Sequence, residues 1–265
     1  MAIHSSAFVD PGAELGVDVE VLPYTIIEAG TVIGDRTVLG PHAVVRKWTN
    51  IGSDCLISTG CVLGEPPQDR KYEGEETYLR VGNGNQIREY VTFHRASGEG
   101  NSTVVGDNNL IMAYCHAGHN VQIGSNISIA NAVQLAGHAV VQDYANIGGM
   151  SGFHQFVTIG TMAMVGAMSR ITRDVPPYSI VEGIPAEVHG LNIIGLERRG
   201  VSAESRAVLR KAFRLLFRSE HNVSDAMKAV GAEVSAEERS PELEYLLEFI
   251  ELVQAGAMGR QQSHR

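Results

Sequence analysis

One feature of this sequence constrains its fold more than any other: an apolar residue returns at every sixth position. Stepping by six from Val9 reaches apolar residues as far as Ile171, and the only exceptions are Asp69, Glu75 and Glu99. An α-helix repeats about every 3.6 residues and a strand about every two, so neither element alone explains this period. The period suits very short strands, each followed by a tight turn.

Two further positions of the six-residue repeat are biased. The residue after the apolar one is often glycine, as at Gly34 and Gly124, and the fourth residue after it is small or β-branched, as at Thr25 and Cys55. We expect the glycines to supply the turns. Three repeats then form a triangular coil of about 18 residues, and coils stack at about 4.8 Å. A glycine-rich β-sandwich is the alternative, but its strands would not keep one register for so long.

The repeat also predicts the domain organisation. Polar segments interrupt it near residues 65–79 and 95–104, and we expect both to loop out over a groove. The strand pattern stops at Pro176 and Pro177 and a helical period follows. We predict a parallel β-helix over residues 1–190 and an α-helical domain over 191–265. The predicted helices start at the Ser202 cap, at 223–230 and at 241–255, and a frayed tail is expected over 256–265.

The composition excludes several classes of protein. A net charge of −9 argues against a general nucleic-acid-binding protein. No apolar run approaches the roughly 18–20 residues of a membrane span, and the N-terminus has no signal-like apolar core. Cys55, Cys61 and Cys115 lack zinc or redox spacing, so they are read as reduced, buried thiols. We therefore expect a cytoplasmic protein without stable membrane insertion.

Histidines gather on one strip when coils of about 18 residues are stacked. Residues that far apart lie in one column, and neighbours in sequence flank it. The strip contains His119, Gly137, Gln155, His138, His154 and, three residues before the corner, His116. Scattered surface histidines have no reason to gather on successive coils. The strip is therefore the candidate functional site, and a purely structural trimeric scaffold would not require it.

Metal binding and general-base catalysis compete as explanations of this strip. Neutral histidines on adjacent strands are good zinc ligands, but His116 and His119 would point along different edges of the coil. A histidine titrates near neutral pH, so it can take a proton from a hydroxyl during acyl transfer from a thioester. The backbone N–H of Gly137, one coil above His119, can face the developing oxyanion. We favour a general base without a metal.

Longer motifs make the interpretation more specific. They are "QDRKYEGE" (68–75), "IREYVTFHR" (87–95), "HAGHNVQIG" (116–124), "LAGHAVV" (135–141), "IGGMSGFHQF" (147–156), "DVPPY" (174–178) and "NIIGLERRG" (192–200). With these motifs the chain resembles the UDP-N-acetylglucosamine acyltransferases, hexapeptide-repeat enzymes that begin lipid A biosynthesis in Gram-negative envelopes. The resemblance implies a left-handed β-helix and a homotrimer with active sites in the grooves between subunits.

The resemblance also implies an activity and the residues that carry it. The family transfers an (R)-3-hydroxyacyl chain from acyl carrier protein to the glucosamine 3-hydroxyl of UDP-N-acetylglucosamine, and needs no bound cofactor because phosphopantetheine arrives on the carrier protein. The general base falls on His119 and the oxyanion-stabilising amide on Gly137. Substrate-binding positions fall on Asp69, Lys71, His116, His138, His154, Gln155, Asn192 and Arg198. Ala167 falls where a glycine leaves the longest acyl groove, so we expect a somewhat shorter chain.

Two positions depart from the family pattern. Asn120 stands where an acid usually follows the catalytic histidine, and Ile194 replaces an acid that helps to hold the nucleotide. The acceptor therefore stays open between UDP-N-acetylglucosamine and its 2,3-diamino analogue. A related enzyme that acylates an amino-sugar nitrogen is the alternative activity. Seven basic residues between Arg198 and Arg218 are opposed within that segment only by Glu204, and we expect them to steer the acidic carrier protein.

Overall fold

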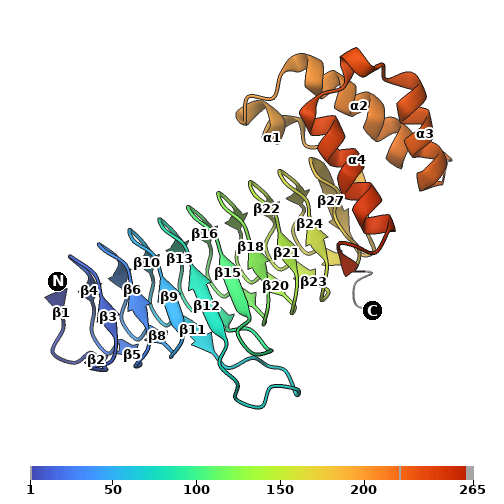
Figure 1. Ribbon diagram of the computed structural model, residues 1–265. Coiled ribbons are helices and arrows are strands. Elements are labelled where there is room, and N and C mark those ends of the chain that lie inside the picture. The colour runs from blue at the N-terminus through green and yellow to red at the C-terminus, as the bar shows by residue number, and fades with distance from the viewer. Residues whose placement is uncertain (1, 221, 261–265) are drawn as a thin grey trace.

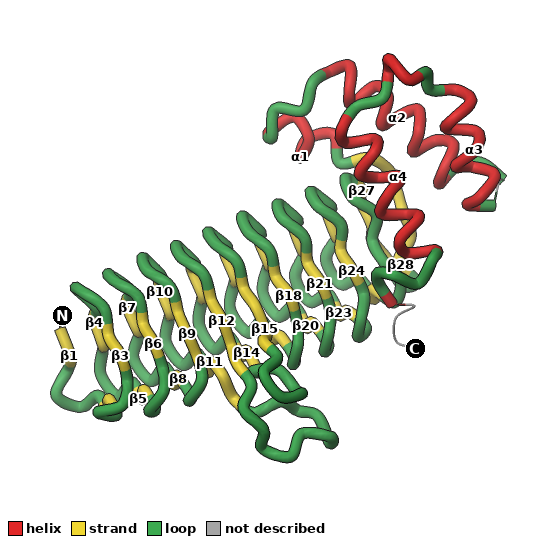
Figure 2. Tube along the Cα trace, in the orientation of Figure 1, coloured by secondary structure: helices red, strands yellow, loops and turns green. Residues whose placement is uncertain are grey.

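The computed structural model describes residues 2–220 and 222–260 of the chain. Triangular coils stack along most of its length, and helices gather at one end of the stack (Figure 1). Figure 2 shows short strands alternating with turns along the stack. The predicted fold class is confirmed: the molecule is a left-handed parallel β-helix followed by an α-helical region.

Three β-sheets form the sides of the triangular coils. They are named here faces A, B and C, in the order in which the chain enters them. Face A contains β1 (Ala2–Ile3), β4 (Glu20–Val21), β7 (Val38–Leu39), β10 (Leu56–Ile57), β13 (Gln86–Ile87), β16 (Leu110–Ile111), β19 (Ser128–Ile129), β22 (Asn146–Ile147), β25 (Met164–Val165), β27 (Ser179–Gly183) and β28 (Ala186–Leu191). Face B contains β2 (Phe8–Val9), β5 (Ile26–Ile27), β8 (Val44–Val45), β11 (Val62–Glu65), β14 (Thr92–His94), β17 (His116–Ala117), β20 (Gln134–Leu135), β23 (Gly152–Phe153) and β26 (Arg170–Ile171). Face C contains β3 (Glu14–Leu15), β6 (Val32–Ile33), β9 (Thr49–Ile51), β12 (Tyr78–Val81), β15 (Ser102–Val105), β18 (Gln122–Ile123), β21 (Val140–Val141) and β24 (Thr158–Ile159).

The strand register follows the repeat. Each strand pairs in parallel with the strand of the next coil, as Ile129 pairs with Ile147. The two inserted loops lengthen the spacing where they occur, so that Ile57 pairs with Ile87 across the first insertion. Only β27 and β28 pair antiparallel among the strands of the described residues, and they form the hairpin that ends the stack.

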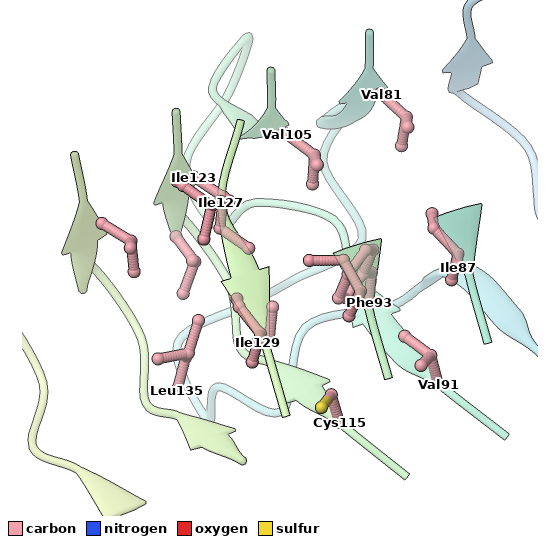
Figure 3. Close-up of a cluster of buried hydrophobic side chains, with 14 of the residues drawn as sticks. Val81, Ile87, Val91, Phe93, Val105, Cys115, Ile123, Ile127, Ile129 and Leu135 are labelled. Carbon is pink, nitrogen blue, oxygen red and sulfur yellow. The ribbon is translucent and has the colours of Figure 1, made fainter. Parts of the chain in front are cut away.

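The core is the column of apolar residues that the repeat predicts. Successive residues of a strand point to opposite faces, so the second residue of each short strand points inward. Figure 3 shows Ile87, Phe93, Ile129 and Leu135 pointing together into the interior of the coils, and all four are buried. The three cysteines are buried and unpaired, as expected.

The predicted turn role of the repeat glycines is wrong. Neither Gly34 nor Gly124 has a left-handed φ. A Cβ on Gly34 would instead lie 2.5 Å from the carbonyl carbon of Gly52 in the next coil. Glycine is therefore required by the close approach of successive coils. The left-handed residue comes two positions later and usually carries a side chain, as at Arg36 and Asn126.

The turns form three corners that run along the stack. The A–B corner follows face A and contains Ala167, which is exposed. The B–C corner follows face B and contains His119, Gly137 and Gln155. The C–A corner follows face C and contains a ladder of short polar side chains: Asp35, Asn83, Asp107, Ser125 and Asp143.

The helical region packs as a second hydrophobic cluster at the end of the stack. It contains α1 (Ile193–Arg198), α2 (Ala203–Phe217), α3 (Val223–Glu233), η1 (Ala236–Glu238) and α4 (Pro241–Gln254). The Ser202 hydroxyl caps α2 as predicted, by accepting a bond from the Ser205 N–H at 3.0 Å, whereas α1 was not expected. None of the helices within residues 2–220 and 222–260 is both long and apolar enough to cross a membrane.

The expectation of a frayed tail is wrong for residues 256–260. The Arg260 N–H donates to both carboxylate oxygens of Asp174 at 3.2 Å, so this segment returns to the last coil of the β-helix. The rest of that expectation, over residues 261–265, lies outside the described residues.

Candidate active site

A groove of about 530 Å³ lies on face B beside the B–C corner. The outward-pointing first residues of consecutive strands form its floor, because the inward positions are occupied by the core. One wall is formed by the residues of the corner itself. The lining includes Gln68, His116, His119, Gln134, Gly137, Gly152, His154, Gln155, Arg170 and Thr172. The structure therefore brings together most of the predicted strip on one surface.

The imidazole of His119 is held in a defined orientation. Its Nδ1 lies 2.9 Å from Asn120 Oδ1. The Asn120 amide is fixed in turn, because its Oδ1 accepts from the Ser97 N–H at 3.0 Å and its Nδ2 donates to the Ser97 carbonyl at 3.1 Å. Since Oδ1 only accepts, His119 Nδ1 carries the proton and Nε2 carries the free lone pair. This is the tautomer that a general base requires at Nε2.

The free nitrogen of His119 lies against Gly137. A Cβ on Gly137 would be 2.7 Å from His119 Nε2, so a side chain at this position would displace the ring. Among the described residues, none accepts a hydrogen bond from the Gly137 N–H. The groove thus contains a proton acceptor and an unused backbone donor side by side, and both line the same surface.

His138 closes the corner beside this pair. Its ring meets that of His119 edge-to-face at 5.2 Å and stacks on Phe156 at 4.5 Å. Burial, with a smaller effect from His119, lowers the pKa of His138. The ring therefore stays neutral near pH 7 and contributes an apolar surface with one donor nitrogen.

The loop over residues 65–79 brings a carboxylate to the site. Asp69 Oδ2 accepts from the Ser97 hydroxyl at 2.9 Å, and its Oδ1 accepts from the Lys71 N–H at 3.0 Å. These bonds lower the pKa of Asp69, and the charge of His119 contributes in the same direction. Asp69 is therefore ionised and lies at the end of a chain of contacts that runs through Ser97 and Asn120 to His119. The Lys71 side chain is exposed.

His116 and a histidine that the sequence reasoning missed lie deeper on face B. His116 Nδ1 is 2.8 Å from Thr92 Oγ1, and its ring meets His94 edge-to-face at 5.1 Å. Burial, with a smaller effect from His94, lowers the pKa of His116 to about 4. Thr92 pairs with His116 across the second inserted loop, so these two residues are not separated by the usual 18 residues of one coil. The motif "TFH" before that loop is the signal that could have identified His94.

Six of the predicted positions are not among the lining residues of this groove: Asp69, Lys71 and His138 belong to the neighbouring loop and corner, and Asn192, Arg198 and Ala167 lie elsewhere in a single chain. The Asn192 side chain caps α1, since its Oδ1 accepts from the Gly195 N–H at 3.0 Å and its Nδ2 donates to the Met162 carbonyl at 2.8 Å. Arg198 ends the same helix. Ala167 lies at the A–B corner, on the opposite edge of face B from His119.

The basic segment surrounds a small cavity of about 190 Å³ beside α2. Its lining combines Val188, Leu191, Phe213 and Phe217 with Arg210, Arg214 and Arg218. Glu204 is not the only opposing acid in space, because Glu197 lies 3.1 Å from Arg206 and Glu233 lies 3.7 Å from Arg214. An apolar floor and a cationic rim therefore meet at this cavity.

The residues that the structure describes contain no group of three or more His, Cys, Asp or Glu side chains arranged to hold a metal ion. The histidines of the strip instead contact neighbouring polar groups and rings. His119 contacts Asn120, and His116 contacts Thr92.

The chain is similar to known acyltransferases over nearly its whole length. A family model described as UDP N-acetylglucosamine O-acyltransferase, domain 2, matches residues 174–258, and a model of bacterial transferase hexapeptide repeats matches residues 30–65 and 102–137. An acyl-[acyl-carrier-protein]–UDP-N-acetylglucosamine O-acyltransferase of Thermodesulfovibrio yellowstonii is 44% identical over 255 residues, which cover 96% of this chain and 98% of that protein. The enzyme of the same name from Synechocystis is 52% identical over 188 residues, 71% of this chain and 68% of that protein.

Solved structures agree with these relatives. A UDP-N-acetylglucosamine acyltransferase from Bacteroides fragilis matches with a TM-score of 0.90 at 38% identity, over 94% of this chain and 96% of that chain. The enzyme from Campylobacter jejuni matches with a TM-score of 0.86 at 32% identity, over 94% of this chain and 95% of that chain.

Proposed function

The chain belongs to the family of acyl-[acyl-carrier-protein]–UDP-N-acetylglucosamine O-acyltransferases, and on that premise we propose its reaction and the residues that perform it. It transfers an (R)-3-hydroxyacyl chain from acyl carrier protein to the 3-hydroxyl of UDP-N-acetylglucosamine, the first step of lipid A biosynthesis. The reaction takes place in the cytoplasm. The observation that carries this proposal is the pairing of a free His119 Nε2 with an unused Gly137 N–H in one groove.

His119 acts as the general base. Its Nε2 removes the proton of the sugar 3-hydroxyl while the hydroxyl oxygen attacks the thioester carbonyl carbon. The Gly137 N–H donates to the carbonyl oxygen as negative charge develops there. When the carbon–sulfur bond breaks, the imidazolium returns its proton to the departing thiolate of phosphopantetheine. No cofactor is bound by the enzyme in this scheme, because the thioester arrives on the carrier protein.

Asn120 and Asp69 together replace the acidic residue that usually follows the catalytic histidine: one fixes the His119 tautomer and the other stabilises the imidazolium. Asn120 accepts the His119 Nδ1–H, so it fixes the tautomer, but a neutral amide gives little stabilisation to the imidazolium. The ionised Asp69 carboxylate interacts electrostatically with His119 and is tied to Asn120 through Ser97. We infer that Asp69 supplies the negative charge, at the far end of a hydrogen-bonded chain.

The remaining positions bind substrate. His116, His154 and Gln155, which line the groove, contact the sugar, the diphosphate and the start of the acyl chain. His138, whose ring lies against His119, contacts the same substrate groups, and Lys71 reaches the diphosphate from its loop. Asn192, Arg198 and Ala167 lie away from the groove of their own chain. In a homotrimer a neighbouring subunit brings such residues to a groove, where the first two contact the nucleotide and phosphopantetheine and Ala167 ends the acyl channel.

Acyl carrier protein docks on the α2 cavity. The arginine rim attracts an acidic partner, and the apolar floor accommodates an apolar side chain of the partner or the phosphopantetheine arm. This site leaves the groove on face B free for the acceptor sugar.

Product analysis tests the proposed function. The protein is incubated with (R)-3-hydroxyacyl carrier proteins of several chain lengths and with either UDP-N-acetylglucosamine or its 2,3-diamino analogue. We expect an O-acylated UDP-N-acetylglucosamine, identified by mass and by its sensitivity to mild base. Ile194, which is 62% exposed and stands where the family has an acid, is the observation that favours the diamino sugar. A base-stable N-acyl product formed only from that sugar would replace the proposed acceptor with the alternative.

A further inference from the structure

The C-terminal segment reaches the active-site groove. Figure 1 shows α4 running back from the helical region toward the last coils of the β-helix, so that the end of α4 lies beside them. Arg260 there contacts Asp174, Thr172 and His154. Two of these partners, Thr172 and His154, line the groove described above.

The contact with Asp174 is specific. Asp174 Oδ1 accepts from the Thr158 N–H at 2.7 Å and from the Arg260 N–H at 3.2 Å, so one carboxylate joins the last coil to the tail. Gly259 has a left-handed φ of 75°, and a Cβ there would lie 2.3 Å from Asp174 Oδ2. Only glycine meets both conditions. The tail therefore has a built docking site on the β-helix.

The docked tail places the Arg260 guanidinium against His154. One guanidinium nitrogen donates to the Thr172 carbonyl, and another lies 3.4 Å from His154 Nε2. A guanidinium has donors only, so His154 Nε2 must be the acceptor. The proton of the neutral ring is then on Nδ1, which lies 3.1 Å from the Gln155 carbonyl. Both ring nitrogens are thus engaged by the protein.

We propose that Arg260 is a positioning residue of this enzyme: docked through Asp174, it holds the His154 imidazole at the end of the groove as the Nδ1–H tautomer. This inference rests on the proposed function in taking His154 as a residue that contacts substrate. A ring whose nitrogens are both engaged offers its face and its C–H edge to the substrate. Arg260 therefore acts on substrate binding and leaves the proton transfer at His119 unaffected.

Two variants undock the arginine by different means. Arg260→Ala removes the guanidinium, and Gly259→Ala keeps it but blocks the approach to Asp174. We expect either variant to raise KM for UDP-N-acetylglucosamine about tenfold, the size expected for losing one charge-assisted hydrogen bond. The value of kcat and the melting temperature should stay close to wild type. A chain that ends at Arg260 is the matched control and should behave as wild type.

Coupling to His154 separates this role from a merely structural one. If Arg260 acts through His154, then Arg260→Ala adds no further rise in KM to the variant His154→Ala. Multiplied effects in the double variant would overturn the proposal, and so would an unchanged KM in both single variants.

A spectroscopic reading needs no substrate. Nitrogen-15 shifts of labelled histidine side chains report which ring nitrogen carries the proton. We expect His154 to be the Nδ1–H tautomer in the wild-type protein and to lose that preference in Arg260→Ala. An Nε2–H tautomer in the wild type would contradict the proposal even if the enzyme is active. A wild type that makes no product, while its tautomer is as expected, would refute only the proposed function.

Discussion

The B–C and C–A corners of the β-helix have the same backbone conformation but differ in what their backbone N–H groups bind. Both place a left-handed residue in each turn, as at His138 (φ 61°) and Asn126 (φ 58°). At the C–A corner a side chain of the next coil accepts the backbone N–H of the turn: Asp143 Oδ1 accepts from the Ser125 N–H at 2.8 Å. At the B–C corner Gly137 has no side chain to offer the coil below, and its own N–H stays available.

The difference shows where the chemistry of this fold comes from. The repeat presents the same N–H at equivalent positions of both corners, and a short polar side chain there turns it into a structural bond. Such side-chain-to-backbone hydrogen bonds occur at the C–A corner over many coils. The B–C corner replaces the polar side chains by His119, Gly137 and Gln155, and a donor and a base remain free. The two corners therefore predict opposite responses to substitution.

The largest effect should come from removing the base. His119→Ala should lower the transfer rate about 10²–10⁴-fold, the usual contribution of general-base catalysis, and leave the melting temperature unchanged. Steady-state rates and thermal unfolding of the same sample measure both quantities. A variant that keeps more than about a tenth of the wild-type rate would remove His119 from the role of base.

The next largest effect should come from making the B–C corner resemble the C–A corner. Gln155→Asp places a short carboxylate at the position equivalent to Asp143, where it accepts the Gly137 N–H. Loss of one oxyanion donor should lower kcat about 10²-fold without loss of stability. Gln155→Ala, which leaves the N–H open, is the control and should cost much less. Equal losses in the two variants would show that this N–H is not the oxyanion donor.

The reverse change at the C–A corner should affect stability alone. Asp107 Oδ1 accepts from the Asn83 N–H at 2.6 Å, and Asp107→Ala leaves that donor without its partner. We expect the free energy of unfolding to fall by about 1 kcal/mol, with an unchanged transfer rate. Urea unfolding and a rate assay test this pair of outcomes, and a slowed reaction with intact stability would break the comparison.

The smallest effect should come from the A–B corner, which has neither the polar ladder of the C–A corner nor the catalytic residues of the B–C corner. Ala167 stacks on Gly149 in the coil below, and we predict that it ends the acyl channel in the assembled enzyme. Each buried methylene contributes about 0.8 kcal/mol, so discrimination should be roughly fourfold per carbon. The preferred chain should lengthen in Ala167→Gly and shorten in Ala167→Met on a ladder of acyl carrier proteins. If neither variant shifts the optimum, the channel ends elsewhere.

The sequence allowed the coils to be predicted because the register is a local property. A fixed period places His119 over Gly137 without any knowledge of tertiary contacts. The same arithmetic failed where the chain leaves the coil. The inserted loops conceal the pairing of Thr92 with His116, and with it His94. The contact of Ser97 with Asn120 was not predicted for the same reason, because Ser97 lies in an inserted loop.

Two other features depended on contacts that no local pattern carries. The repeat glycines are needed because coils approach each other closely, and the sequence alone suggested a turn. Arg260 reaches His154 only because α4 folds back on the β-helix, whereas its position near the end of the chain indicated a frayed tail.

The central claim is that His119 accepts the proton of the sugar hydroxyl, and chemical rescue tests it most directly. His119→Ala leaves room beside Gly137 for a free imidazole. Added imidazole should restore transfer in this variant in a saturable manner, and the rescue should grow with pH as imidazole loses its proton near pH 7. The Gln155→Asp variant, whose base is intact, should gain nothing. If His119→Ala binds UDP-N-acetylglucosamine as wild type does but imidazole never raises its rate, the proposed role of His119 is contradicted.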